Sequence, residues 1–247
     1  MFNAPAKIPE VLLDEYTMSG TIPVIEKYYN ECYGDRNYYW PLSAIEELQA
    51  THTPQNYIEG NIRGPDNRLA KKLIHIAEEY MLHEKSIAVL GCQIPWIECL
   101  FSGMNNDVIS IRTKPALNSE IYNTTMFDHF EQSDTKYDVI VSHHSVEHTG
   151  LGRYGDTLDP AGDVREMRAT HKNLTDDGLL IWVGSVGTDS LIWNSNRVYG
   201  TIGLEKLFKG FIETEWCYKT KQQHTSKELG DHEQAVVLLK KSPEYNV

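Results

Sequence analysis

Two short apolar stretches, Ser86-Ile-Ala-Val-Leu-Gly91 and Tyr137-Asp-Val-Ile-Val-Ser142, decide the fold class of this chain. Each is a nearly continuous run of apolar residues that ends at a small residue, as buried strands do. Asp107–Arg112 and Leu179–Gly184 repeat the pattern, and stretches with helical spacing lie between the four runs. Strands that are apolar on both faces and alternate with helices form parallel sheets covered on both sides. The sequence therefore predicts an α/β protein with a mostly parallel sheet.

The other expected elements follow from the same periodicities. Helices are predicted over Ile94–Gly103, Asp163–Leu174 and Leu204–Phe211. Near the end of the chain, Ile212–Tyr218 and Gln234–Lys240 are expected to pair as an antiparallel hairpin. Residues 1–85 are polar with helical spacing, so we expect a helical N-terminal extension or lid, followed by one sheet domain over residues 86–247.

Composition excludes several classes of protein. The 247 residues include 23 basic and 35 acidic side chains, a net charge of −12, which argues against a nucleic-acid binder. Hydrophobic residues make up 40% of the chain, too many for a disordered polymer. The most apolar stretch, Ser86–Phe101, is interrupted by Gly91, Gln93, Pro95 and Glu98, so no membrane span is expected.

The cysteine pattern bears on the compartment. Cys32, Cys92, Cys99 and Cys217 are scattered and no pair has a C-x-x-C spacing, which argues against a zinc ribbon or a thioredoxin-like site. Scattered thiols suit a reducing compartment, and residues 1–20 lack the pattern of a signal peptide. We therefore expect a cytoplasmic location.

The first predicted strand is followed by Gly91-Cys92-Gln93-Ile94-Pro95-Trp96, where a helix is expected to begin. A glycine permits close approach of a ligand to the backbone, and a helix start offers unpaired N–H groups. The stretch lacks the spaced glycines of a pyrophosphate-binding loop. It indicates either a site for a polar ligand group or an ordinary turn between strand and helix.

Arg112 ends the second strand, where a ribose-binding fold usually has an acidic residue. A guanidinium donates hydrogen bonds and accepts none, so Arg112 cannot accept them from ribose hydroxyls. We expect Arg112 either to face solvent or to hold a carboxylate or phosphate group.

The densest polar segment follows the third strand. It combines histidines and carboxylates with an arginine and a tyrosine: His143, His144, Glu147, His148, Arg153, Tyr154 and Asp156. Histidine suits acid–base catalysis near neutral pH. His144 and His148 are also four residues apart, a spacing that would place both on one helix face toward a metal. Each histidine taken singly has the simpler interpretation of a packed, hydrogen-bonded side chain.

A further polar stretch follows the fourth strand and contains Asn196, Arg197 and Tyr199. Because the carboxyl ends of parallel strands meet at one edge of the sheet, these side chains are candidates to line the same cleft. Tyr199 is equally compatible with a core position. Asp163 is interpreted as the N-cap of the helix that it opens.

Three stretches, Val89–Gly103, Tyr137–Asp163 and Trp193–Gly200, together resemble the family called domain of unknown function 268. That family is similar to a divergent branch of the class I S-adenosylmethionine-dependent methyltransferases, which implies a Rossmann-like fold and S-adenosylmethionine as cofactor. The resemblance implies a cofactor-binding set on the first loop and the neighbouring strand ends: Gly91, Cys92, Gln93, Pro95, Trp96, Arg112, Ser142 and His143. Arg112 stands where the family tends to have an acidic residue, and Asn196 where it tends to have histidine.

The leading hypothesis is methyl transfer to an oxygen or nitrogen of a small-molecule or glycan acceptor. His148 or His144 is the expected base, oriented by Glu147 or Asp156. The expected substrate-binding residues are Arg153, Tyr154, Asp156, Asn196, Arg197 and Tyr199. Residues 86–184 hold 14 acidic and 7 basic side chains, and such a field suits a cationic sulfonium better than a phosphate-rich ligand.

Two alternatives remain open at this point. The first is a non-catalytic, methyltransferase-like binding or scaffold protein, which Arg112 and the single glycine of the first loop favour. The second is a metal-dependent hydrolase that uses His144, His148 and nearby aspartates.

Overall fold

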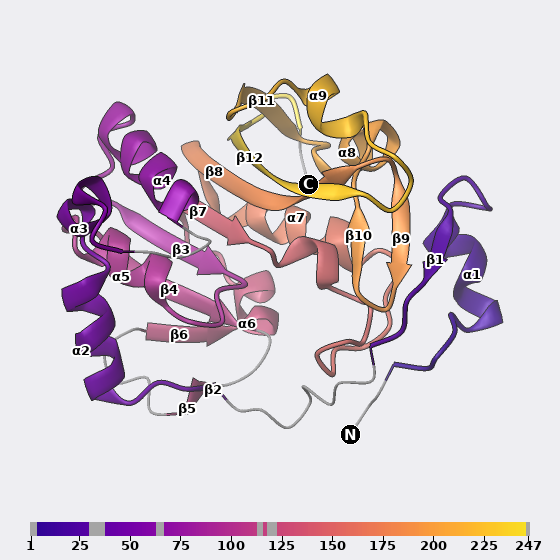
Figure 1. Cartoon of the computed structure of the whole chain (residues 1–247), viewed down its shortest axis with the longest axis horizontal. Coiled ribbons are helices and arrows are strands. Elements are labelled where there is room, and N and C mark those ends of the chain that lie inside the picture. Colours follow the sequence, from indigo (N-terminus) through magenta and orange to yellow (C-terminus); the bar gives the residue numbers. More distant parts are fainter. Residues whose placement is uncertain (1–3, 30–37, 63–66, 113–115, 118–122, 246–247) are drawn as a thin grey trace.

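A seven-stranded sheet forms the centre of the molecule (Figure 1). The computed structural model describes residues 4–29, 38–62, 67–112, 116–117 and 123–245. The strand order is β11 (Phe211–Trp216), β12 (His232–Lys241), β8 (Leu174–Gly187), β7 (Tyr137–His143), β3 (Ser86–Leu90), β4 (Asp107–Arg112) and β6 (Asn123–Met126). The last five run parallel, whereas β12 is antiparallel to both β8 and β11. The predicted mostly parallel sheet and terminal antiparallel hairpin are therefore confirmed.

The predicted elements agree with the structure to within a few residues. Strand β4 has the predicted bounds, β7 runs one residue further to His143, and β8 extends the predicted strand at both ends. Helix α5 (Trp96–Ser102) begins two residues later than predicted, and α7 (Gly162–Asn173) begins one residue earlier. Helix α8 (Thr201–Leu207) ends before the predicted Phe211, because Phe211 already opens β11.

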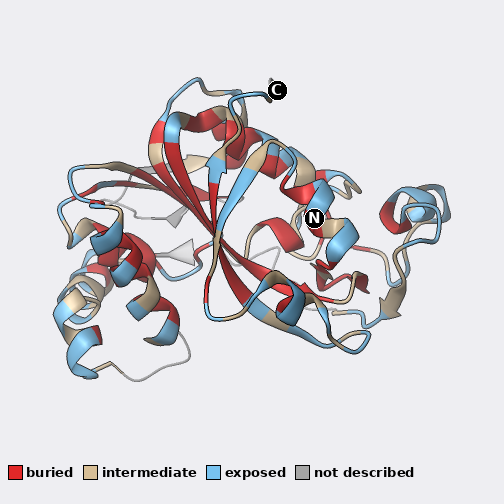
Figure 2. Cartoon of the chain, turned by 90° about the horizontal axis from the view of Figure 1, so that it is seen from above, coloured by how far each residue is buried: buried red, intermediate tan, exposed pale blue. Residues whose placement is uncertain are grey.

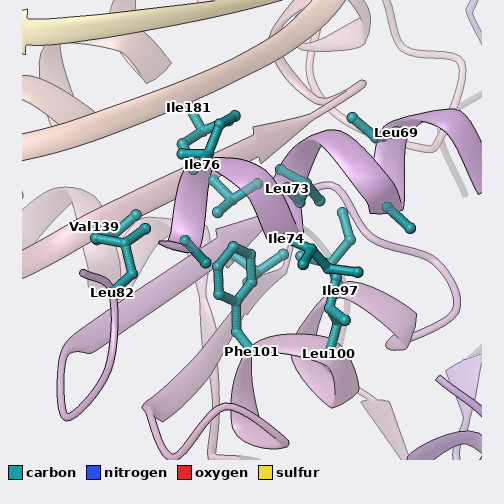
Figure 3. Close-up of a cluster of buried hydrophobic side chains, with 14 of the residues drawn as sticks. Leu69, Leu73, Ile74, Ile76, Leu82, Ile97, Leu100, Phe101, Val139 and Ile181 are labelled. Atoms are coloured by element: carbon teal, nitrogen blue, oxygen red, sulfur yellow. The ribbon is translucent and has the colours of Figure 1, made fainter. Parts of the chain in front are cut away.

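One face of the sheet is covered by α3 (Pro54–Glu59), α4 (Asn67–Glu79) and α5. Helix α4 buries Leu69, Leu73 and Ile76, which recur every three or four residues and form one apolar stripe. Figure 3 shows this stripe facing the side chains of α5 and of the sheet. Each fully buried leucine or isoleucine contributes about 1.5–3 kcal/mol through removal of its surface from water.

The other face is covered by α6 (Phe127–Gln132), α7 and α8. Trp182 of β8 lies at the centre of this core and makes edge contacts with Tyr199 and Phe208. Figure 2 shows that buried residues run through the middle strands of the sheet, while exposed residues lie on the outer helices and at the β11 edge. The sheet is thus covered on both sides, as its continuous apolar strands require.

The N-terminal residues pack at two separate places (Figure 1). Helix α1 (Glu10–Thr17) and β1 (Val24–Glu26) lie beside a small hairpin of β9 (Ser190–Trp193) and β10 (Asn196–Val198), and β1 pairs in parallel with β9. Helix α2 (Leu42–Thr51) lies at the opposite end, against α5, and β2 (Tyr38–Tyr39) pairs with β5 (Ala116–Leu117). This region therefore contains short strands besides the expected helices, and α4 belongs to the main core.

Helix α9 (Lys221–Thr225) lies in the connection between β11 and β12. Among the described residues, every helix is too short or too polar to cross a lipid bilayer.

Candidate functional site

A cleft opens at the carboxyl ends of β3, β4 and β7, the edge where ligands bind to open parallel sheets. Counted out to its open mouth, and so including open solvent, the cleft holds about 720 Å³ of space. The lining combines apolar and polar side chains: Leu90, Gly91, Cys92, Gln93, Ile111, Arg112, Phe127, His144, Ser145, His148, Thr149, Tyr154 and Asp156. The structure thus brings together eight of the sequence-predicted residues in one concave site: Gly91, Cys92, Gln93, Arg112, His144, His148, Tyr154 and Asp156.

Gly91 lies at the tight turn after β3. Its φ angle is +85°, and a Cβ atom there would lie 2.3 Å from the carbonyl oxygen of His143 and 2.8 Å from Cβ of Ser145. Only glycine fits at this position, because the backbone of Gly91 lies so close to His143 and Ser145, and this holds independently of any ligand. The close approach joins the first loop of the cleft to the histidine segment.

Arg112 closes one wall of the cleft and is buried. Its Nη1 donates a hydrogen bond of 3.1 Å to the carbonyl oxygen of Cys92, and its guanidinium lies 4.2 Å from the ring centre of Trp40. Stacking on an indole and donation to a carbonyl stabilise a buried guanidinium. Of the two expectations for Arg112, exposure to solvent is wrong.

His144 is bound to a buried carboxylate. Its Nδ1 lies 2.6 Å from Oε1 of Glu147, and its Nε2 lies 3.3 Å from Oε1 of Gln234 on β12. Burial alone would raise the pKa of Glu147, but the hydrogen bond from His144 and the electrostatic interactions with His144 and His148 lower it to about 2. Glu147 is therefore ionised at neutral pH, and Ser185 Oγ also donates to it at 3.3 Å.

His148 is oriented by a backbone carbonyl. Its Nδ1 lies 2.7 Å from the carbonyl oxygen of Ser195, and because a carbonyl only accepts, Nδ1 carries the proton. Burial lowers the pKa of His148, so the ring is neutral at pH 7 and Nε2 is unprotonated. Tyr154 packs edge-on against the ring, with 5.5 Å between the ring centres. The ring is therefore held in one defined tautomer.

Asp156 organises the loop that carries Tyr154. Its Oδ2 accepts from the backbone N–H groups of Gly150 and Gly152 at 2.7 and 3.1 Å, and its Oδ1 accepts from Tyr154 N at 3.2 Å. Among the described residues that line the cleft, Asp156 carries the one acidic side chain. The orienting partner of His148 is thus Ser195 rather than Glu147 or Asp156.

The remaining predicted cofactor residues lie behind the lining. Trp96 is buried in the core and makes an edge contact with His143, with 5.9 Å between ring centres. Burial lowers the pKa of His143 to about 4, so this ring is neutral. Ser142 is fully buried within β7, and Pro95 precedes the first residue of α5. These four residues support the site from the inside.

Arg197 and Tyr199 lie apart from the cleft, in a second cavity beside α1. The Arg197 guanidinium donates to the carbonyl oxygens of Thr149, Asp159 and Pro160, and its Nε lies 3.4 Å from Oδ2 of Asp163. Its donors are used within the protein, so Arg197 fastens the loop after His148.

Asp163 does not cap α7, because the N-cap is Ala161 and makes no side-chain cap. From inside the first turn, the Asp163 carboxylate accepts from the backbone N–H of Val164 at 2.8 Å and from the hydroxyl of buried Tyr199 at 3.2 Å.

Arg153 and Asn196 meet at Ser195. Arg153 Nη1 donates to Ser195 Oγ at 3.1 Å, and Ser195 Oγ donates to Oδ1 of buried Asn196 at 2.8 Å. The Arg153 guanidinium also lies 4.6 Å from the ring centre of Tyr29. Both residues therefore hold the turn whose carbonyl orients His148.

The proposed helical pair of histidines does not form. Residues Val146–His148 are a single 3-10 turn, and His144 has a φ angle of +48°, so no α-helix carries both rings. Within the part of the chain that the structure describes, no three or more His, Cys, Asp or Glu side chains converge to hold a metal. The hydrolase alternative therefore lacks a metal centre there.

Sequence reasoning missed Trp40, Ser145, Thr149 and Ser195. Ser145 and Thr149 lie inside the polar segment but were not singled out. Ser195 acts through its carbonyl, a group that every residue has, so its side-chain type carries no signal. Trp40 is 72 residues from Arg112, and nothing local marks the contact.

Similar folds occur among solved methyltransferase structures. A Galdieria sulphuraria protein assigned as a sarcosine dimethylglycine methyltransferase has a TM-score of 0.50 and 10% identity, over 69% of this chain and 83% of that one. An S-adenosylmethionine-dependent methyltransferase from Clostridium acetobutylicum has a TM-score of 0.49 and 12% identity, over 76% and 96% of the two chains. A Burkholderia thailandensis 1,6-didemethyltoxoflavin-N1-methyltransferase has a TM-score of 0.47 and 12% identity, over 87% and 98%.

At 10% identity, similarity to the Galdieria structure is evidence for the fold and not for the function. Together with the sheet order, it identifies a Rossmann-like class I methyltransferase fold, as the sequence predicted. No curated protein matches the sequence. Residues 84–242, more than half of the chain, match the family described as "Caenorhabditis protein of unknown function, DUF268", so the chain belongs to the DUF268 family.

Proposed function

We propose that this protein is an S-adenosylmethionine-dependent methyltransferase that acts on an oxygen or nitrogen atom of a small-molecule or glycan acceptor. The observation that carries the proposal is the state of His148, a neutral ring in the cleft lining whose proton is held on Nδ1 by Ser195. Methyl transfer mainly needs positioning, together with a base that takes the proton of the acceptor. The unprotonated Nε2 of His148 supplies that base.

The residues of the cleft suit the chemistry of the cofactor. Leu90, Ile111 and Phe127 offer apolar surface for a flat purine ring. The Asp156 carboxylate attracts a sulfonium or ammonium group, and the positive charge of Arg112 attracts a carboxylate. Gly91, Cys92 and Gln93 of the first loop complete the set that would hold the cofactor. When bound, S-adenosylmethionine supplies an electrophilic methyl group.

The two cleft histidines receive different roles. His148 accepts the acceptor proton at Nε2, and Tyr154 packs against its ring to keep it in place. His144 has Nδ1 committed to Glu147, so we assign it to binding rather than to proton transfer. The polar groups of Ser145, Thr149 and Asp156 suit an acceptor rich in hydroxyl or amide groups.

Calorimetry with the intact chain tests the proposal. S-adenosylmethionine and S-adenosylhomocysteine are each titrated into the protein, and binding of one molecule per chain is expected. His148→Gln is the matched variant, since it removes the base and leaves the first loop intact. It should bind S-adenosylhomocysteine within about threefold of the wild type. Absence of heat at millimolar ligand would remove the proposal.

A second candidate is a non-catalytic, methyltransferase-like binding or scaffold protein. Arg112 favours it, because at the end of β4 the position that binds ribose in related folds holds a guanidinium stacked on Trp40. This candidate predicts a folded protein that gives no heat with either cofactor form and retains a protein or glycan partner.

A further inference from the structure

Trp40 connects the N-terminal region to the cleft. It lies between β2 and α2, is buried, and forms a small cluster with Ile45 and Leu48 of α2 and Cys99 of α5. Helix α5 begins directly after the first loop of the cleft. The cluster therefore anchors Trp40 against the helix that the loop leads into.

Two contacts run from this anchor to the loop. The indole Nε1–H of Trp40 donates a hydrogen bond of 3.2 Å to the carbonyl oxygen of Gln93. The indole ring also lies under the guanidinium of Arg112, which donates to the carbonyl oxygen of Cys92 at 3.1 Å. One stacked pair, Trp40 and Arg112, therefore holds two consecutive carbonyl groups.

The planarity of the peptide bond extends this effect to the amide groups. In a trans peptide the C=O group and the N–H group of the next residue point in opposite directions. Holding the Cys92 and Gln93 carbonyls toward Trp40 and Arg112 turns the N–H groups of Gln93 and Ile94 the other way. The stacked pair thus sets which backbone groups this part of the loop presents.

We propose that Trp40 is a positioning residue for the ligand of the cleft, supplied by a part of the chain that precedes the family match over residues 84–242. It acts by fixing the peptide groups that follow Cys92 and Gln93 and the orientation of the Arg112 guanidinium. Cys92, Gln93 and Arg112 all line the cleft. The identity of the ligand used as a probe rests on the proposed function, whereas the control of the loop by Trp40 does not.

Two substitutions in one cluster separate positioning from stability. Trp40→Phe keeps an aromatic ring under Arg112 and removes the hydrogen bond to Gln93. Ile45→Val also removes packing from the cluster, but its side chain carries no hydrogen bond to the loop. Urea unfolding establishes how much each variant lowers the stability of the folded protein. Calorimetry with S-adenosylhomocysteine then gives the affinity of the cleft.

Trp40→Phe should weaken S-adenosylhomocysteine binding by about 3- to 10-fold, the effect of one lost hydrogen bond. Ile45→Val should weaken it less than about twofold. The proposal is overturned if Trp40→Phe binds as the wild type does, or if both variants weaken binding equally.

If the wild type binds no S-adenosylhomocysteine, the proposed function is refuted. Amide hydrogen exchange then still tests whether Trp40 controls the loop. The Trp96 amide donates at 2.8 Å to the carbonyl oxygen of Ile94, within the controlled loop. We expect faster exchange of this amide in Trp40→Phe and unchanged exchange in Ile45→Val. Exchange at the wild-type rate in Trp40→Phe refutes control of the loop by Trp40.

Discussion

Replacing Glu98 by glutamine should make the protein relatively more stable as the pH rises toward neutrality. Glu98 lies in the first turn of α5 and is fully buried, with Oε1 accepting a hydrogen bond of 2.7 Å from Ser110 Oγ. Burial raises the pKa of Glu98 to about 7, although the hydrogen bond from Ser110 and the charge of Arg112 act in the opposite direction. The side chain is therefore largely protonated in the folded protein below neutral pH.

The magnitude follows from the difference between the folded and unfolded pKa values. Below pH 4.5, the value for an unperturbed glutamate, both states carry the proton. Between pH 4.5 and 7 the unfolded chain loses the proton and the folded chain keeps it, so wild-type stability falls by about 1.4 kcal/mol per pH unit. Over this window the contribution of Glu98 amounts to about 3 kcal/mol. Glutamine does not ionise and keeps an acceptor for Ser110.

Urea unfolding followed by tryptophan fluorescence, at several pH values from 4.5 to 8, measures the effect. The quantity to plot is the unfolding free energy of Glu98→Gln minus that of the wild type, because other titrating groups cancel in the difference. It should rise by about 3 kcal/mol and level off above pH 7. A flat or falling difference would refute the reasoning, since it would mean that Arg112 and Ser110 stabilise an ionised Glu98 in the folded state.

Three further perturbations follow from the site. His148→Gln should lower the methyl-transfer rate by about 10²- to 10⁴-fold, measured as kcat with the acceptor once it is identified, because the base is lost. Gly91→Ala should destabilise the fold by more than about 2 kcal/mol in urea unfolding, because its Cβ would lie 2.3 Å from the His143 carbonyl oxygen. Glu147→Gln should lose stability relative to the wild type as the pH rises from 2 to 4.5, by up to about 3 kcal/mol, since the lowered pKa of Glu147 stabilises the wild type above that window. Unfolding free energies of the variant and the wild type, measured across this pH range, check the direction of the Glu147→Gln effect.

The sheet could be predicted from sequence because its strands are short apolar runs, a local signal. Asp107–Arg112 forms a strand with the predicted bounds, and the polar segment after β7 lies at the cleft as expected. Two local rules failed where tertiary contacts outweighed them. Asp163 was expected to cap a helix but accepts from Arg197 and Tyr199. His144 and His148 are four residues apart, but no α-helix forms there, so this spacing does not place both rings on one helix face.

The pairing of β1 with β9 had no local signal at all. Val24–Glu26 is three residues long, and its partner Ser190–Trp193 lies more than 160 residues further along the chain. The contacts of Trp40 with Arg112 and Gln93 are of the same kind. Such contacts depend on how distant elements meet, which periodicity and composition do not encode.

The same pairing has a consequence for biosynthesis. At about 5–20 residues per second, β9 leaves the ribosome roughly 10–30 s after β1. During that interval the Val24–Glu26 strand has no partner, and Tyr16 lacks Trp193, the ring against which it packs at 5.4 Å. Helix α1 and β1 are therefore synthesised well before the strand that fixes them, so binding factors at the ribosome have their best access to this segment during that time.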